Sequence, residues 1–296
     1  MFYGIVLALS TALAESLVDV LRKKSGSAFD PLIASWMLST VTFVAGLILT
    51  GAFDPTPFPV TTDFWAPLIA TTLLNSVAMY LYMSVLATGE LSLVLPLVTL
   101  SPVFLLFTAP LINGEYPSWI GILGVIITTL GTYGLKFEDR AQGFWKPITN
   151  LLAERRNQKM LLVAFIWAWS SALDKEASLA SSPFWFLTLM DGGLMLIYLP
   201  FMFRAKRWAI IGKDQAWVRL LPLGLMNTLR AWCQFTSVTL ILVPYAIGLK
   251  RLSIFFGLLW AYWIFKEKTP RSRVIAAIVM LVGSVLILLA SFNSGQ

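Results

Sequence analysis

The 296-residue sequence contains no histidine and only one cysteine. Without histidine there is no His-based catalytic triad, no imidazole general base and no Cys/His metal site. Cys233 lies within an apolar run, where a cysteine fills space as other small apolar side chains do. A Gly-x-x-x-x-Gly-Lys-[Ser/Thr] phosphate loop is also missing. The sequence therefore predicts no resident metal or cofactor and no ATPase of its own.

Charge is scarce too. Charged residues make up 12% of the chain, hydrophobic residues 58%, and the mean hydropathy is +0.78. A soluble domain carries about 25% charged residues, so a soluble enzyme, a disulfide scaffold and a disordered chain are excluded. The net charge is +7, but most basic residues lie in short connections between apolar runs. This distribution does not indicate nucleic-acid binding.

Apolar runs fill most of the chain. A membrane-spanning helix needs about 20 apolar residues, and ten runs of roughly that length can be marked. They predict an all-α polytopic membrane protein with ten transmembrane helices. The approximate bounds are 2–24, 31–52, 64–87, 91–113, 117–136, 159–180, 183–204, 216–239, 243–265 and 270–291.

The longest connection, 137–158, divides the chain nearly in half. Within it, residues 144–156 place apolar side chains at helical spacing, with Pro147 near the start and Arg155 and Arg156 at the end. This pattern predicts a helix lying at the membrane surface, with an ordinary loop as the alternative.

Basic residues gather on one side of the predicted bundle. Apart from Lys175 and three cations inside spans, every Lys and Arg belongs to the connections after the first, fifth, seventh and ninth runs, counted with their flanking helix ends. Short cytoplasmic loops of membrane proteins are enriched in Lys and Arg. We therefore expect these connections in the cytoplasm and both termini outside, in a prokaryotic inner membrane.

The sequence contains an internal repeat. Four pairs of identical residues, given at the end of this paragraph, are each 152 positions apart, and Asp174 follows Asp19 by a similar 155 positions. The pattern predicts a first five-helix repeat at 1–136 and a second at 159–296. Because five spans is an odd number, the second copy would insert with inverted topology, as in many secondary transporters. A duplicated packing scaffold is the alternative. Four identical pairs share an offset of 152: Asn75 and Asn227, Ser101 and Ser253, Glu115 and Glu267, and Gly131 and Gly283.

Three cations interrupt the repeat inside spans: Arg230, Lys250 and Arg251. A charge at the bilayer centre costs several kcal/mol unless it is paired or hydrated. Arg and Lys both bind phosphate and carboxylate groups, so the trio predicts an anion-binding site. The alternative is that the cations only neutralise the acids of the same bundle. The equivalent residues of the first repeat are the uncharged Ala78, Val98 and Thr99.

Acidic residues inside spans are candidates for proton coupling, because a carboxylate in a low-dielectric site can carry a proton. These candidates are Asp19, Asp174, Glu15 and Asp191. Solvation at a helix end is the alternative for Asp19. Glu115 lies in a tight loop before Pro117, as its repeat partner does before Pro270, and a turn or capping role is expected for both.

Aromatic, proline and glycine residues add structural expectations. Tyr80, Trp232 and Tyr245 are candidates to line a cavity, although most aromatic residues should be core. Prolines in the fourth run and at the start of the ninth predict broken or bent helices near the binding region. Glycines in the fifth run predict a close-packed helix face or a dimer contact. The residues are Pro96, Pro102, Pro110 and Pro244, and Gly121, Gly124, Gly131 and Gly134.

The sequence resembles the drug/metabolite transporter superfamily in its ten-helix EamA form. The resemblance spans the whole chain and is clearest at Ser-Ala-Leu-Asp-Lys (171–175), at Tyr-Ala-Ile-Gly-Leu-Lys-Arg-Leu-Ser (245–253) and at Phe-Lys-Glu-Lys (265–268). The Lys250–Arg251 pair is also similar to the pair that holds substrate phosphate in the triose-phosphate translocators, distant relatives together with the nucleotide-sugar translocators. The resemblance implies phosphate or carboxylate ligands at Lys250 and Arg251, with Lys175 assisting. The family is often drawn with cytoplasmic termini, whereas the basic residues here favour the opposite orientation.

These observations predict a secondary transporter that works by alternating access, driven by a proton or by exchange. We expect it to carry a small anionic or zwitterionic metabolite, either phosphorylated or carboxylated. Membrane lipids are expected partners, a homodimer stays open, and no nucleic acid is expected. A flippase for a lipid-linked phosphate is the first alternative. A lipid-modifying enzyme fits less well, because the acids are scattered over three predicted helices instead of one water-facing site.

Overall fold

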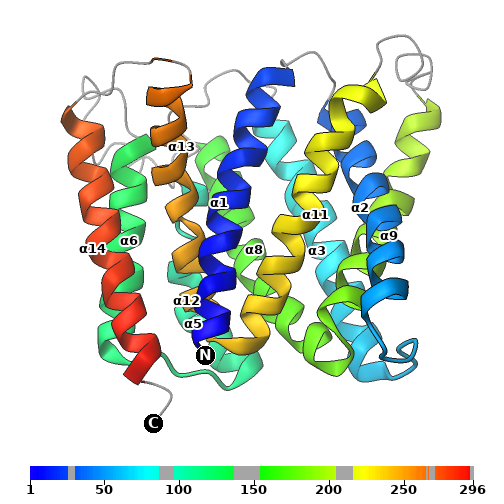
Figure 1. Ribbon diagram of the computed structural model, residues 1–296, viewed down its shortest axis with the longest axis horizontal. Helices are drawn as coiled ribbons and strands as arrows, with labels where there is room; N and C mark the ends of the chain where they lie inside the picture. The colour runs from blue at the N-terminus through cyan, green and yellow to red at the C-terminus, as the bar shows by residue number, and fades with distance from the viewer. Residues whose placement is uncertain are drawn as a thin grey trace.

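The computed structural model describes residues 1–25, 31–86, 97–136, 154–204, 216–264, 266 and 271–293. Every regular element within these residues is an α-helix, and the helices stand side by side in one bundle (Figure 1). The first half contains α1 (Phe2–Ser25), α2 (Pro31–Phe53), α3 (Thr62–Leu86), α5 (Ser101–Asn113) and α6 (Trp119–Lys136). The second half contains α8 (Arg155–Ala180), α9 (Pro183–Arg204), α11 (Ala216–Leu240), α12 (Val243–Lys250), α13 (Leu252–Trp263) and α14 (Arg271–Asn293).

The outer faces of the helices are apolar. On α14, for example, Ile275, Ile278, Val282, Val285 and Leu289 are all more than half exposed, and they recur every three or four residues along one face. Six segments are long and apolar enough to cross a membrane, and two shorter apolar helices, at 101–113 and 119–134, accompany them. Such outward faces suit hydrocarbon, where the helix satisfies its own backbone hydrogen bonds.

The internal repeat is visible in how the helices pair. The most extensive contacts join α1 to α11, α3 to α8, α2 to α9 and α6 to α14, so each pair takes one helix from each half. Exchanging the two halves maps this set of pairs onto itself. Helix starts obey the sequence offset as well: Pro31 and Pro183 open α2 and α9, and Trp119 and Arg271 open α6 and α14, each 152 positions apart.

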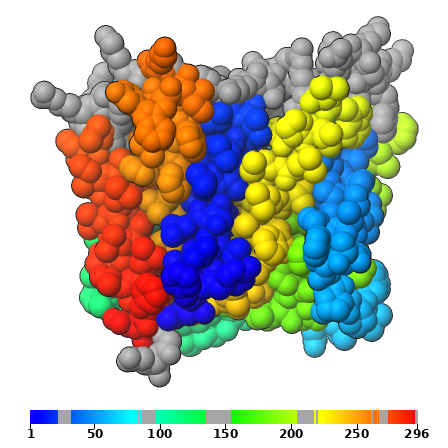
Figure 2. Space-filling model, viewed as in Figure 1, coloured from blue at the N-terminus to red at the C-terminus, as the bar shows by residue number. Residues whose placement is uncertain are grey.

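Paired helices run antiparallel. Early α1 meets late α11 where the Ser237 hydroxyl donates to the carbonyl of Gly4, at 2.9 Å. At the start of α8, Lys159 Nζ donates to Ser84 Oγ near the end of α3, at 3.2 Å. The start of α1 and the end of α14 lie at the same end of the bundle, which we call the terminal end (Figure 1). On the face shown in Figure 2, helices from the two halves alternate and pack closely.

Of the fifth-run glycines, Gly124 and Gly131 lie in close contact with α14 and Gly134 in ordinary contact with it, whereas Gly121 faces Tyr245 of α12. A Cβ atom on Gly283 would come within 2.4 Å of the Thr128 backbone nitrogen and 2.8 Å of the Gly124 carbonyl oxygen. A Cβ atom on Gly131 would come within 2.6 Å of the Met280 nitrogen. Only glycine lets two backbones approach this closely. These contacts occur within the chain, between its two halves.

Both repeats contain a helix break at equivalent positions. α5 starts at Ser101 after a turn at 99–100, with Pro102 in its first turn, and Pro96 lies outside the described residues. The ninth apolar run, marked at 243–265, is divided into two helices. α12 ends at Lys250, Arg251 forms the junction, and α13 starts at Leu252. Pro244 opens α12 as expected, whereas Pro110 lies inside α5.

Residues 144–153, which make up most of the surface helix expected at 144–156, lie outside the described residues. Arg155 and Arg156, which were expected to end that helix, are instead the first residues of α8. α8 therefore starts four residues before the bound expected from hydropathy, because the apolar count misses a polar first turn.

Candidate functional site

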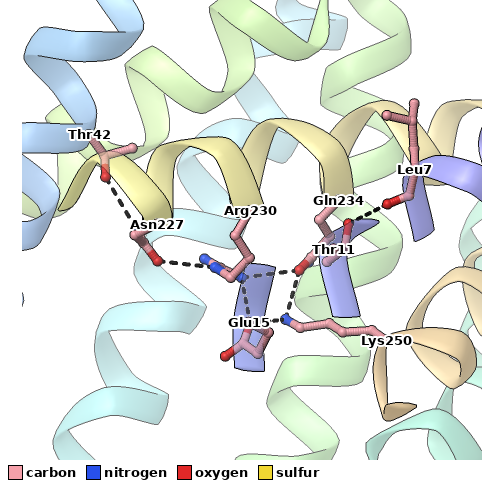
Figure 3. Close-up of polar contacts among 8 residues, drawn as sticks. All are labelled: Leu7, Thr11, Glu15, Thr42, Asn227, Arg230, Gln234 and Lys250. Carbon is pink, nitrogen blue, oxygen red and sulfur yellow. Dashed lines mark hydrogen bonds and ion pairs between the residues drawn. The ribbon is translucent and has the colours of Figure 1, made fainter. Parts of the chain in front are cut away.

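Three charged side chains from three helices meet in the bundle (Figure 3). Glu15 comes from α1, Arg230 from α11 and Lys250 from the last turn of α12. One oxygen, Glu15 Oε2, lies 3.2 Å from Arg230 Nη1 and 3.4 Å from Lys250 Nζ. The Arg230, Lys250 and Glu15 side chains are 19%, 21% and 25% exposed, respectively. They are therefore enclosed by protein and still accessible to a small molecule or ion.

Two amide side chains of α11 complete this arrangement. Asn227, Arg230 and Gln234 are spaced by three and four residues, which places them on one helix face. Gln234 Oε1 accepts hydrogen bonds from Lys250 Nζ at 2.7 Å and from Arg230 Nη1 at 3.3 Å. Asn227 Oδ1 accepts from Arg230 Nε at 3.0 Å, and its Nδ2 donates to Thr42. We call Glu15, Asn227, Arg230, Gln234 and Lys250 the central cluster.

Arg251 lies at the helix break next to the central cluster. Its Nη2 donates to Ser101 Oγ at 2.5 Å, and its buried Nε has no hydrogen-bond partner among the residues that the structure describes. Ser101 is the first residue of α5, and Arg251 itself precedes α13. The guanidinium therefore lies at the positive N-terminal end of α5, and its own backbone caps that of α13. Two cations share the Glu15 carboxylate, and the third donates to a hydroxyl.

Asp174 belongs to a second buried polar group between α3 and α8. Asn75 Nδ2 donates to Ser170 Oγ at 2.6 Å, and Thr71 Oγ1 lies 2.6 Å from Ser170 Oγ and donates to Asp174 Oδ1 at 2.5 Å. Asp174 is 5% exposed. Thr71 has only one hydroxyl hydrogen and donates it to Asp174, so Ser170 must donate to Thr71. The hydrogen bonds therefore form a chain in which Asn75 donates to Ser170, Ser170 to Thr71 and Thr71 to the Asp174 carboxylate.

Removing the Thr71 hydroxyl should destabilise the folded protein, because the buried Asp174 carboxylate loses a hydrogen-bond donor. Thr71→Val keeps the side-chain shape but leaves Asp174 Oδ1 without its donor, so unfolding should become easier by about 1–3 kcal/mol. The matched control is Thr108→Val, because Thr108 is 2% exposed and its hydroxyl has no hydrogen-bond partner. Thermal unfolding of both variants is the measurement. Equal melting temperatures for the two would contradict this role for Thr71.

Asp191 lies on α9 and is 7% exposed. Ser39 of α2 hydrogen-bonds to its carboxylate, and Arg230 acts on it electrostatically. Lys250 acts in the same way on Asp174. The structure therefore places both candidate coupling acids in the electrostatic field of the central cluster, whereas Asp19 lies on an exposed part of α1.

Four residues predicted for the site from sequence lie elsewhere. Lys175 pairs with Glu115 and not with the central cluster. Tyr245 is buried and accepts a hydrogen bond from the Ser118 backbone at 3.0 Å. Trp232 stacks on Phe184, with ring centroids 5.5 Å apart. Tyr80 is 71% exposed on the outside of α3.

Comparison with known families decides the class of the protein. The sequence matches one transporter family twice, over residues 2–137 and again over residues 158–289. The chain belongs to the EamA-like transporter family. EamA-like proteins are membrane transporters, so this chain is an integral membrane protein of a transport family. A comparison with curated proteins finds no match.

The EamA-like chain also shares its fold with solved structures. One of them, described as a crystal structure of a protein, matches with a TM-score of 0.76 and 12% sequence identity. The match covers 97% of this chain and 98% of the other. At this identity the likeness concerns the fold alone.

Proposed function

We propose that this EamA-like chain is a secondary transporter of a small anionic or zwitterionic metabolite, phosphorylated or carboxylated. The observation that carries the proposal is the sharing of Glu15 by Arg230 and Lys250. A structural ion pair in a membrane bundle needs only one cation for each acid, because every surplus charge is costly there. Two accessible cations that face one carboxylate are suited to hold an anion from outside the chain in place of that carboxylate.

The proposed anion contacts follow from the geometry. Arg230 and Lys250 would hold the anion at the position that Glu15 Oε2 occupies, so Glu15 serves as the counter-ion of the empty carrier. Arg251 would supply a further contact through its unpartnered Nε. The N-terminal ends of α5 and α13 would add their partial positive charge, since broken helices in transporters direct such ends at anionic groups.

The proposed transport cycle uses the repeat. Antiparallel packing of α1 on α11 and of α3 on α8 supports ten spans arranged as two inverted repeats. Rocking one repeat against the other would expose the central cluster to each side in turn. When the anion displaces Glu15, that carboxylate is left without its cations and becomes a place for a proton to bind, which would couple transport to a proton gradient. We keep Asp174 and Asp191 as further coupling candidates.

The proposed orientation rests on the basic helix ends. Arg155, Arg156 and Arg271 lie at helix starts on the end of the bundle opposite the two termini (Figure 1). By the positive-inside rule this end would face the cytoplasm.

Ligand stabilisation of the purified protein tests the proposal. Inorganic phosphate, phosphorylated sugars and dicarboxylates should raise the melting temperature, and cationic amines should not. At one hundred times its dissociation constant a ligand stabilises the folded protein by about 2.7 kcal/mol. Lys250→Ala and Arg251→Ala should lose most of this response, whereas Lys159→Ala, at the far end of α8, should keep it. Stabilisation by amines but not by anions would contradict the substrate class, and a full anion response in both the Lys250→Ala and the Arg251→Ala protein would contradict the site.

A further inference from the structure

The end of the bundle that carries the termini holds a dense set of contacts between the two repeats. The connection between α5 and α6 belongs to the first repeat, and together with the last residue of α5 it makes several hydrogen bonds to the second repeat. Asn113 Nδ2 donates to Glu176 Oε1 at 2.5 Å and to the Ala172 carbonyl at 3.0 Å. Two residues on, Glu115 forms a buried ion pair with Lys175.

Glu115 links three segments at once. Its Oε1 accepts a hydrogen bond from the Lys175 ammonium group. Its Oε2 accepts one from the backbone N–H of Val243 at 2.8 Å, at the positive N-terminal end of α12. Lys175 Nζ also donates to the carbonyl of Ile241, just beyond the end of α11, at 3.1 Å. Glu115 thus does cap a helix, as its position suggested, but the helix belongs to the other repeat. The Glu115 and Lys175 side chains are only 7% and 12% exposed.

Ser118, directly before α6, binds the hydroxyl of Tyr245 through both its backbone N–H and its side chain, at 3.0 and 3.2 Å. Tyr245 lies on α12 between Val243 and Lys250. Because an α-helix rises 1.5 Å per residue, Val243 is only about 10 Å along α12 from Lys250 of the central cluster. The contacts therefore close the bundle directly beyond the proposed anion site.

The sequence shows that this arrangement cannot be repeated at the opposite end. Glu115 has a repeat partner of the same type, Glu267, but the residues that bind around it do not. At the offsets of the repeat, Lys175 corresponds to Val20, Asn113 to Phe265 and Tyr245 to Leu93. The ion pair and its neighbouring hydrogen bonds are thus specific to one end of an otherwise duplicated bundle.

We propose that Asn113, Glu115, Ser118, Lys175, Glu176 and Tyr245 form a latch that holds the terminal end of the bundle shut in the resting protein. The proposal rests on the alternating-access part of the proposed function, and it adds that the two closed states are unequal. Opening this end must break the Glu115–Lys175 pair, and water would then hydrate both charges. Removing one partner leaves the other charge buried and unpaired in the shut state only, so it favours the open state.

A cysteine reporter behind the latch tests the proposal. Cys233, the only cysteine, is replaced by Ala, and Ala246 of α12, which is 3% exposed, is replaced by Cys. We expect Lys175→Met and Glu115→Gln each to raise the rate at which a water-soluble maleimide labels Ala246→Cys by about tenfold or more, since tenfold corresponds to only about 1.4 kcal/mol. Ala172→Cys serves as a second reporter.

Two controls separate the latch from unfolding and from general loosening. Lys159→Met makes the same change on the same helix at the opposite end, and it should leave the labelling rate of Ala246→Cys unchanged. Native Cys233, 3% exposed, should stay unreactive in Lys175→Met and Glu115→Gln proteins that lack the reporter. Unchanged labelling in both latch variants, equal labelling in Lys159→Met, or a matching rise at Cys233 would each overturn the latch.

Ligand stabilisation by inorganic phosphate, measured on the same proteins, keeps the two proposals apart. Faster labelling in proteins that no anion stabilises supports the latch and contradicts the substrate class. Anion stabilisation in latch variants with unchanged labelling supports the substrate class and overturns the latch.

Discussion

Replacing Glu15 with Gln is expected to strengthen anion binding and to slow transport. Arg230 and Lys250 lie 3.2 and 3.4 Å from one oxygen of Glu15, so an incoming anion must displace this carboxylate. Gln keeps the size of the side chain and removes its negative charge. A hydrogen bond to a charged group contributes about 1.5–3 kcal/mol, so losing this competitor should tighten anion binding by about tenfold or more.

The same substitution should lower the thermal stability of the protein when no anion is bound. Without Glu15, the two cations keep only the amide oxygens of Gln234 and Asn227 as described hydrogen-bond acceptors. A buried charge that loses its partner destabilises a protein by about 3–5 kcal/mol, and the partial exposure of both cations reduces that figure here. Glu15→Gln should therefore melt at a lower temperature than the parent without ligand, and it should gain more from added phosphate.

Transport should fall because the cycle needs the empty carrier to return. In the parent, Glu15 can neutralise the cations after the anion leaves, whereas the Gln variant retains either the anion or two unpaired charges. Calorimetric titration with phosphate and exchange uptake into liposomes measure the two effects. Asp19→Asn is the matched control, since Asp19 lies one turn further along α1 at an exposed position. Weaker anion binding by Glu15→Gln than by Asp19→Asn would contradict the counter-ion role.

The sequence predicted the fold well where hydropathy and the repeat decided it. The run expected at 31–52 is the helix Pro31–Phe53, and the repeat offset of 152 recurs in the starts of two helix pairs. It did not locate the junction at Arg251, which divides the ninth run into two helices. Hydropathy measures only apolarity, and it does not show that Arg251 contacts Ser101 in the other repeat.

The central cluster could be predicted only in part. Arg230 and Lys250 interrupt the repeat, and the structure brings both to Glu15. Glu15 was selected as a coupling acid only, because no local pattern shows that α1 packs on α11. Gln234 was missed, although its place one turn after Arg230 on the same face is a usable signal.

Lys175 illustrates the limit of adjacency in sequence. It follows Asp174 directly and lies in a family-like motif, which made it a plausible ligand of the same anion. Successive residues on an α-helix point about 100° apart, however. Asp174 therefore faces Thr71 on α3, whereas Lys175 faces Glu115 beyond the end of α5. Tyr80 was misplaced for the same reason, because a polar tip on an apolar helix does not reveal which face it occupies.

Adding one methyl group at Gly283 should destabilise the protein severely, whereas the same change at Gly257 should not. A Cβ atom on Gly283 would lie 2.4 Å from the Thr128 nitrogen and 2.8 Å from the Gly124 oxygen, and both are backbone atoms that no rotamer change can move. α6 and α14 would have to separate along their whole contact. Overpacking typically costs about 1–3 kcal/mol, occasionally more, and this contact should lie at the upper end.

Gly257 of α13 is the matched control, because nothing lies within 4 Å of its added Cβ atom. There the methyl group removes the helix penalty of glycine, which is about 1 kcal/mol relative to alanine. Gly257→Ala should thus keep or raise the melting temperature, and Gly283→Ala should lower it. Thermal unfolding of the two purified variants is the measurement, and equal melting temperatures would contradict the close contact.

The pair Gly124 and Gly283 makes this prediction sharper. A Cβ atom on Gly124 would also meet the backbone of α14, at 2.8 Å from the Gly283 oxygen and from the Ile287 nitrogen. Once one alanine has forced the helices apart, the second meets less resistance, and neighbouring sites of this kind are not additive. The double variant should therefore lose clearly less stability than the sum of the single losses. Full additivity would mean that the two glycines act on separate contacts, which would contradict a shared close contact between α6 and α14.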